Sequence, residues 1–185
     1  IKNLIFALFG QAFGLIISFL GRIVFVKILT DEYLGLNSLF TNILTMLSLV
    51  ELGVGSAIVY SLYKPLAVND KEKIKSLMLL YKKAYTLIGI IIMLLGIISL
   101  PFYRYLINEV PNIKNLDLIY FLFVLNTSVS YFYSYKRSLI ISDQKRYIAT
   151  IYRYGFYFIL NVVQIIVLLI TKNYLLFLIV QVIFT

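Results

Sequence analysis

The sequence predicts an all-α membrane protein, a polytopic bundle of helices that crosses the bilayer several times. Of its 185 residues, 62% are hydrophobic and 14% are charged, whereas a soluble domain is about half apolar and about a quarter charged. The mean hydropathy is +0.95. The chain holds no Cys and no His, which excludes disulfide scaffolds, thiolate or imidazole metal sites and imidazole catalysis. We therefore expect no metal and no cofactor.

Five apolar runs are long enough to cross the hydrocarbon core of a bilayer, which needs about 20 helical residues. A β-barrel is not expected, because runs such as Leu87–Leu100 do not alternate. We interpret the first run as a retained span rather than a cleaved signal, and the chain as an amino-terminal fragment of a larger protein. Residues 1–185 form one bundle, with spans expected at residues 4–29, 36–62, 84–102, 116–141 and 148–170 and a truncated sixth at 174–185.

Turn-forming and charged residues separate these spans. All of the connectors are short, so we expect no enzyme active site on an extramembrane loop. The connectors are predicted at Asp31–Glu32, Pro65–Lys75, Pro101–Asn115, Ser142–Arg146 and Lys172–Asn173.

The distribution of Lys and Arg predicts the orientation, because cytoplasmic loops carry the basic excess. The side that holds the amino terminus is the more basic one, so we expect a cytoplasmic amino terminus. The net charge of +9 is then explained by topology, and no nucleic-acid partner is expected. The richer side holds Lys2, Lys64, Lys71, Lys73, Lys75, Lys82, Lys83, Lys136, Arg137, Lys145, Arg146 and Arg153, and the poorer side holds Arg22, Lys27, Arg104, Lys114 and Lys172.

Four of the five complete spans carry one polar stripe each, at the spacing that places residues on one helix face. Such stripes are typical of helices around a watery cavity, since lipid penalises exposed polar groups. They also occur as helix-packing surfaces, and Gly10 with Gly14 forms a small-residue pair that permits close approach. The stripes are Gln11, Gly14, Ser18 and Arg22; Asn37, Thr41, Ser48, Glu51 and Gly55; Asn126, Ser130, Tyr133 and Arg137; and Thr150, Arg153, Tyr157, Asn161 and Gln164.

Glu51 is the acidic residue that lies deep in a predicted span, about 16 Å below the span end at Leu62. An ionised side chain at the bilayer centre costs about 2.5–3.5 kcal/mol. We therefore interpret Glu51 as functional or paired, and as an ion-coupling candidate. Arg22 and Arg153 are its possible partners by type, and both can instead snorkel to an interface. The cavity candidates are Arg22, Gln11, Asn37, Glu51, Asn126, Arg153, Asn161 and Gln164.

The stretch from Glu32 to Lys75, EYLGLNSLFTNILTMLSLVELGVGSAIVYSLYKPLAVNDKEKIK, resembles the amino-terminal region of bacterial polysaccharide biosynthesis flippases. These proteins belong to the multidrug, oligosaccharidyl-lipid and polysaccharide exporter superfamily. Similar stretches are GRIVFVKIL at residues 21–29 and NTSVSYFYSYKRSLIISDQKRYI at residues 126–148.

The resemblance implies most of one six-helix lobe of an alternating-access transporter in the bacterial cytoplasmic membrane. The implied cargo is an undecaprenyl-diphosphate-linked oligosaccharide for cell-surface polysaccharide. The implied partners are membrane lipids and the polysaccharide assembly machinery. Flippases of this kind use a cationic cavity with arginines on the first helix, to which Arg22 would correspond. The alternatives are an ion-coupled multidrug exporter of the same superfamily and a non-transporting membrane protein of glycan assembly.

Overall fold

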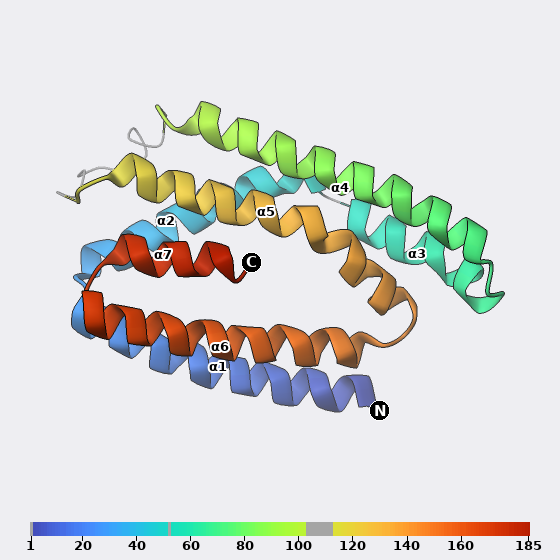
Figure 1. The fold of residues 1–185 in the computed structure, drawn as a ribbon, viewed down its shortest axis with the longest axis horizontal. Coiled ribbons are helices and arrows are strands. Elements are labelled where there is room, and N and C mark those ends of the chain that lie inside the picture. Colours follow the sequence, from blue (N-terminus) through green and yellow to red (C-terminus); the bar gives the residue numbers. More distant parts are fainter. Residues whose placement is uncertain (1, 52, 103–112) are drawn as a thin grey trace.

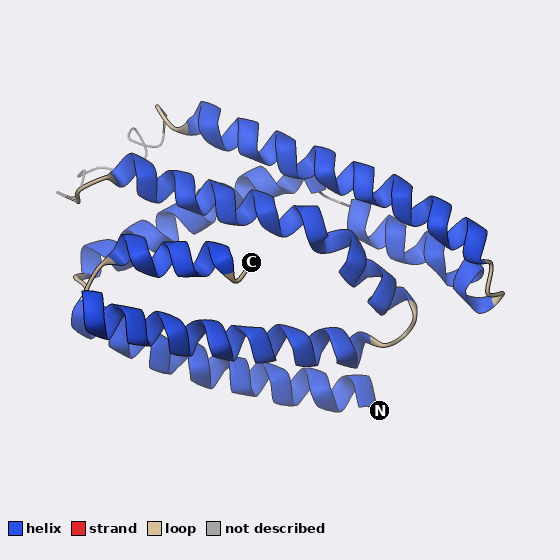
Figure 2. Ribbon diagram, viewed as in Figure 1, coloured by secondary structure: helices blue, strands red, loops and turns tan. Residues whose placement is uncertain are grey.

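The computed structural model describes residues 2–51, 53–102 and 113–185, and all its regular elements are helices, which confirms the predicted all-α class for this part of the chain (Figure 2). Much of the predicted connector Pro101–Asn115 lies outside the described residues. The elements are α1 (Lys2–Ile28), α2 (Asp31–Leu47), a 3-10 helix η1 (Ser48–Glu51), α3 (Val54–Ala67), α4 (Lys71–Ser99), α5 (Leu116–Ser142), α6 (Arg146–Thr171) and α7 (Tyr174–Ile183).

The helices form two groups that are joined by α7 (Figure 1). In one group α1 packs along α6, and in the other α3 and α4 pack against α5. α7 contacts both α5 and α6. One hydrophobic core joins the groups through residues such as Phe25, Phe40, Tyr120 and Leu178. A second core, which includes Ile58, lies between α3, α4 and α5.

Two glycines let α1 and α6 approach closely, as the small-residue pair predicts. The ring of Tyr154 on α6 lies across both Gly10 and Gly14. A Cβ at Gly10 would lie 2.4 Å from Tyr154 Cδ2, and one at Gly14 would lie 2.5 Å from Tyr154 Cε1. Any larger residue at these positions would therefore have to displace the ring.

The second predicted span, residues 36–62, is not one helix in the structure. The α-helix ends at Leu47 and tightens into η1, and α3 begins at Val54. Gly53, between them, has φ of 84°. A right-handed helix cannot continue through this left-handed backbone region, which glycine adopts without a steric penalty. The break places Glu51 at the end of a helical segment rather than in the middle of a straight one.

The third predicted span starts earlier than expected, at Lys71 instead of residue 84. Asp70 supplies the start signal, because its Oδ1 accepts a hydrogen bond from the backbone N–H of Lys73 at 2.9 Å. Pro65 lies inside the last turn of α3 and does not end it. The predicted connector Pro65–Lys75 therefore shrinks to the short turn at residues 68–70.

Among the described residues, five segments are long and apolar enough to cross a membrane. The start of α1, the turn between α3 and α4, and the turn between α5 and α6 lie toward one end of the molecule (Figure 1). The α1–α2 and α6–α7 connections lie toward the other end. The segments are Leu8–Ile28, Asp31–Glu51, Lys71–Ser99, Leu116–Ser142 and Arg146–Thr171.

Candidate functional site

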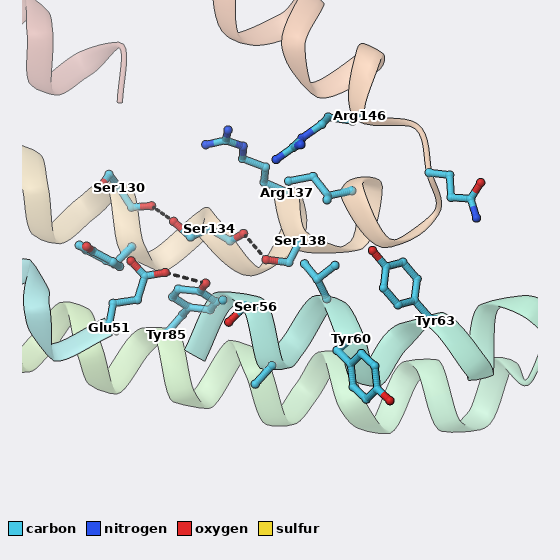
Figure 3. Close-up of a pocket in the computed structure, with 16 residues that line it drawn as sticks. Glu51, Ser56, Tyr60, Tyr63, Tyr85, Ser130, Ser134, Arg137, Ser138 and Arg146 are labelled. Carbon is cyan, nitrogen blue, oxygen red and sulfur yellow. Dashed lines mark hydrogen bonds between the residues drawn. The ribbon is translucent and has the colours of Figure 1, made fainter. Parts of the chain in front are cut away.

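A large polar pocket, called here the first pocket, opens between α3, α5 and the start of α6. Its volume is about 1180 Å³. Figure 3 shows that serine, tyrosine, arginine and glutamate side chains supply most of its polar groups. The polar lining consists of Glu51, Ser56, Tyr60, Tyr63, Tyr85, Ser130, Tyr131, Ser134, Arg137, Ser138, Gln144 and Arg146.

Glu51 is fixed in the first pocket by a tyrosine from α4. The hydroxyl of Tyr85 donates a hydrogen bond to Glu51 Oε1 at 2.9 Å. The Tyr85 side chain is buried, at 2% exposure, and its ring stacks on Tyr131 with the ring centroids 6.4 Å apart. Glu51 itself is half-buried. The helix break at Gly53 and the buried tyrosine together aim one carboxylate at a polar space.

A ladder of serines, one per turn, runs along the pocket face of α5. The Ser134 hydroxyl donates to the Ser130 carbonyl at 2.9 Å, and the Ser142 hydroxyl donates to the Ser138 carbonyl at 2.8 Å. Such bonds to the carbonyl one turn earlier bend helices, and α5 bends visibly in its second half (Figure 1). The small side chains also leave space for the pocket.

Three arginines gather at the same end of the pocket. Arg137 and Arg146 line it, and their side chains lie side by side in Figure 3. Arg137 is close enough to Arg146 and to Arg153 for its charge to interact with each of theirs. Arg153 also lies over the ring of Tyr154, 5.5 Å from its centroid. No carboxylate among the described residues forms an ion pair with any of the three. Unpaired guanidinium groups of this kind favour a phosphate or carboxylate ligand.

A second pocket of about 730 Å³ lies between α1, α2, α6 and α7. It brings together four of the predicted cavity residues, from three helices. It shares no lining residue with the first pocket, and none of the residues that line it is acidic. The four are Arg22, Asn37, Asn161 and Gln164.

Two amides of the second pocket are held by backbone carbonyls. Asn161 Nδ2 donates to the Tyr157 carbonyl at 2.8 Å, and Gln164 Nε2 donates to the Phe177 carbonyl at 3.3 Å. Each bond engages the amide nitrogen, so the amide oxygens keep capacity to accept. Arg22 is exposed and forms no ion pair within the described part of the chain. The pocket therefore offers amide groups and one free cation.

The other predicted cavity residues do not line either pocket. Gln11 is exposed on α1. Asn126 on α5 is half-buried, and its Oδ1 accepts a hydrogen bond from the Thr185 hydroxyl at 2.5 Å. Arg153 is exposed and reaches the first pocket only through its charge. The structure therefore divides the predicted cavity into two pockets and leaves Gln11, Asn126 and Arg153 outside the lining of both.

Sequence reasoning missed Arg146 and Tyr85 as pocket residues, and it included Arg137 in a polar stripe without naming it as a cavity candidate. For Arg137 a signal existed, because it continues the stripe of Ser130 and Tyr133 along the same helix. No comparable signal exists for Tyr85, since only the break near Glu51 brings α4 within reach of that carboxylate.

In the part of the chain that the structure describes, the regular elements are all helices and five segments are long and apolar enough to cross a membrane. Comparison with protein-family models, curated proteins and solved structures finds no match to the chain. Its function therefore has to be argued from the chemistry of the two pockets.

Proposed function

We propose that this chain is part of a membrane transporter that flips an undecaprenyl-diphosphate-linked oligosaccharide across the bacterial cytoplasmic membrane, for cell-surface polysaccharide. The observation that carries the proposal is the first pocket, where Arg137 and Arg146 lie beside tyrosines and serines. A diphosphate needs several guanidinium or ammonium donors to leave water. A sugar needs polar partners for its hydroxyls and apolar rings for its faces.

The residues of the first pocket divide these tasks. Arg137, Arg146 and the nearby Arg153 supply positive charge for the diphosphate. Tyr60 and Tyr63 expose aromatic rings into the same space, at 79% and 46% exposure, and such rings suit the apolar faces of sugars. The lipid tail stays in the bilayer, beside the exposed apolar faces of the helices.

The second pocket suits the glycan rather than the diphosphate. Amide side chains both donate and accept hydrogen bonds, as sugar hydroxyls do. Among the described residues, Arg22 is the cation that lines this pocket, so it supports binding of an acidic substituent on the glycan. On this proposal the cargo contacts α6 in both pockets, because α6 lines each of them.

Glu51 supports a second candidate, an ion-coupled exporter of the same superfamily. The half-buried carboxylate lines the first pocket and is held by Tyr85, so a proton or Na⁺ that binds there would change the charge of the cargo site. The arginines of that pocket would repel a cationic drug, which favours an anionic cargo. A non-transporting protein of glycan assembly would keep the pockets but move no lipid.

The test is flipping of a fluorescent lipid-linked oligosaccharide by the full-length protein in proteoliposomes. We expect transport by the wild type and a loss of about tenfold or more in the double variant Arg137→Gln, Arg146→Gln. The matched control removes two exposed charges near the other end of the bundle, by Lys114→Gln with Lys172→Gln, and should transport normally. Equal transport by both double variants would contradict the proposal, as would no transport by the wild type.

A further inference from the structure

The first part of α4 extends beyond the length that a bilayer requires. α4 has 29 residues, which is about 43 Å of helix, whereas the hydrocarbon core is about 30 Å thick. The hairpin of α3 and α4 also reaches farther than the α5–α6 turn at the same end of the molecule (Figure 1). About 13 Å of helix therefore lies at the level of lipid headgroups or beyond.

This extension is amphipathic, with one face packed and the opposite face free. Ile74, Leu77, Met78 and Tyr81 pack against the second core. A shallow groove of about 520 Å³ follows the opposite face. That groove is lined by Glu72, Lys75, Ser76, Leu79, Leu80 and Lys83.

The groove combines two exposed apolar side chains with one lysine on each side of them along the helix. Leu79 and Leu80 are 54% and 58% exposed, although they are apolar. Lys75 and Lys83 flank them along the helix and are exposed. Neither lysine forms an ion pair with a carboxylate in the described residues. Glu72 lies one turn before Lys75, where its charge suits the start of the helix.

The surrounding charge favours an anionic occupant. Lys64, Lys71, Lys73 and Lys82 lie in the same hairpin, which holds only two acidic residues between Lys64 and Lys83. Basic clusters next to a membrane span attract anionic headgroups, at about 1 kcal/mol per cation. Lysine stems lie along apolar surface while their ammonium groups reach the headgroups. A soluble phosphate would make no use of the exposed leucines.

We propose that this groove on α4 binds one anionic phospholipid, with its phosphate between Lys75 and Lys83 and an acyl chain against Leu79 and Leu80. The lipid holds the α3–α4 hairpin, and with it the wall of the first pocket, at a fixed depth in the bilayer. The inference rests on the membrane location proposed above but not on transport.

The test is native mass spectrometry of the full-length protein in detergent with added phosphatidylglycerol, or with phosphatidylcholine of the same chains. We expect phosphatidylglycerol to bind more tightly. The double variant Lys75→Gln, Lys83→Gln should weaken that binding about 30-fold, at about fivefold per lysine. The matched control Lys71→Gln, Lys73→Gln removes the same charge from the same helix outside the groove, and should weaken binding by about fivefold at most, because these lysines act only through the surrounding charge. Lys75→Arg with Lys83→Arg should retain binding.

Four results would overturn the site. Equal losses in both Gln double variants would show diffuse attraction instead of a groove, and equal binding of the two lipids would remove the role of charge. Competition by glycerol 3-phosphate as effective as by the lipid would remove the role of the leucines. If neither the wild type nor any variant binds phosphatidylglycerol, and the wild type still flips the lipid-linked oligosaccharide in proteoliposomes, this inference is refuted and the proposed function is not. Specific binding of phosphatidylglycerol in the groove, together with no flipping of the oligosaccharide, would support this inference and refute the proposed function.

Discussion

The hydrogen bond between Tyr85 and Glu51 can be removed without changing the packing. Tyr85→Phe deletes the hydroxyl that donates to Glu51 Oε1 at 2.9 Å and keeps the buried ring. Hydrogen bonds to charged groups contribute about 1.5–3 kcal/mol. Because Glu51 is half-buried beside a pocket, water can replace part of the bond. We therefore expect the free energy of unfolding to fall by about 1.5 kcal/mol.

For a chain of this length that loss lowers Tm by about 3–6 °C. The assay is thermal unfolding of the purified protein in detergent, followed by far-UV circular dichroism. Tyr60→Phe is the control, since Tyr60 lines the same pocket with 79% exposure, and its Tm should change by less than about 2 °C. Glu51→Ala and the double variant complete a double-mutant cycle. Strict additivity of Tyr85→Phe and Glu51→Ala would refute the claim that this bond positions the carboxylate.

Three more outcomes are expected. Gly14→Ala should lower the free energy of unfolding by about 1–3 kcal/mol, because the new Cβ would collide with the ring of Tyr154. Gly35→Ala is the control and should leave the free energy of unfolding unchanged, because the space around Gly35 is open. A Gly14→Ala protein as stable as the wild type would argue against the α1–α6 packing. Arg22→Ala should reduce flipping more than Arg22→Lys, and wild-type rates in both would leave Arg22 at an interface with no contact to cargo. The chain has no Cys, so a single introduced Cys reports the side of the membrane on which it lies. In intact cells, a Cys at Asn69 should be protected from an impermeant thiol reagent, and a Cys at Lys114 should react with it. The opposite pattern would show that the orientation is the reverse of the predicted one.

Part of the candidate site follows from the sequence through helical periodicity. Arg22, Asn37, Asn161 and Gln164 lie on the predicted polar faces and meet in one pocket, because residues spaced by three or four positions share a helix face. Gln11 obeys the same spacing but lies beyond the reach of that pocket. Periodicity gives the direction of a side chain on its own helix. Which neighbouring helix that side chain meets depends on the tertiary packing.

The hydropathy and periodicity of the sequence do not predict the break in the second span. The predicted span continues through residues 48–53 without a proline, whereas the α-helix ends at Leu47 and Gly53 takes a positive φ. Glycine tolerates that conformation and does not require it. At Pro65 the sequence predicts the start of a connector, whereas the structure keeps this proline within the last turn of α3. The signal from Asp70, an N-cap residue just before α4, was the better guide.

The most direct test of the central claim is whether the anionic head of the cargo enters the first pocket. Ser134→Cys places a single thiol in that pocket, and Thr171→Cys places one at the exposed end of α6, outside both pockets and the α4 groove, as a control. The measurement is the rate of maleimide labelling in detergent, with and without the lipid-linked oligosaccharide diphosphate. We predict slower labelling at position 134 alone, and no protection when Arg137 and Arg146 are both replaced by Gln. Unchanged labelling at position 134 with saturating cargo, or equal protection at both positions, would contradict the claim that the anionic head of the cargo enters the first pocket.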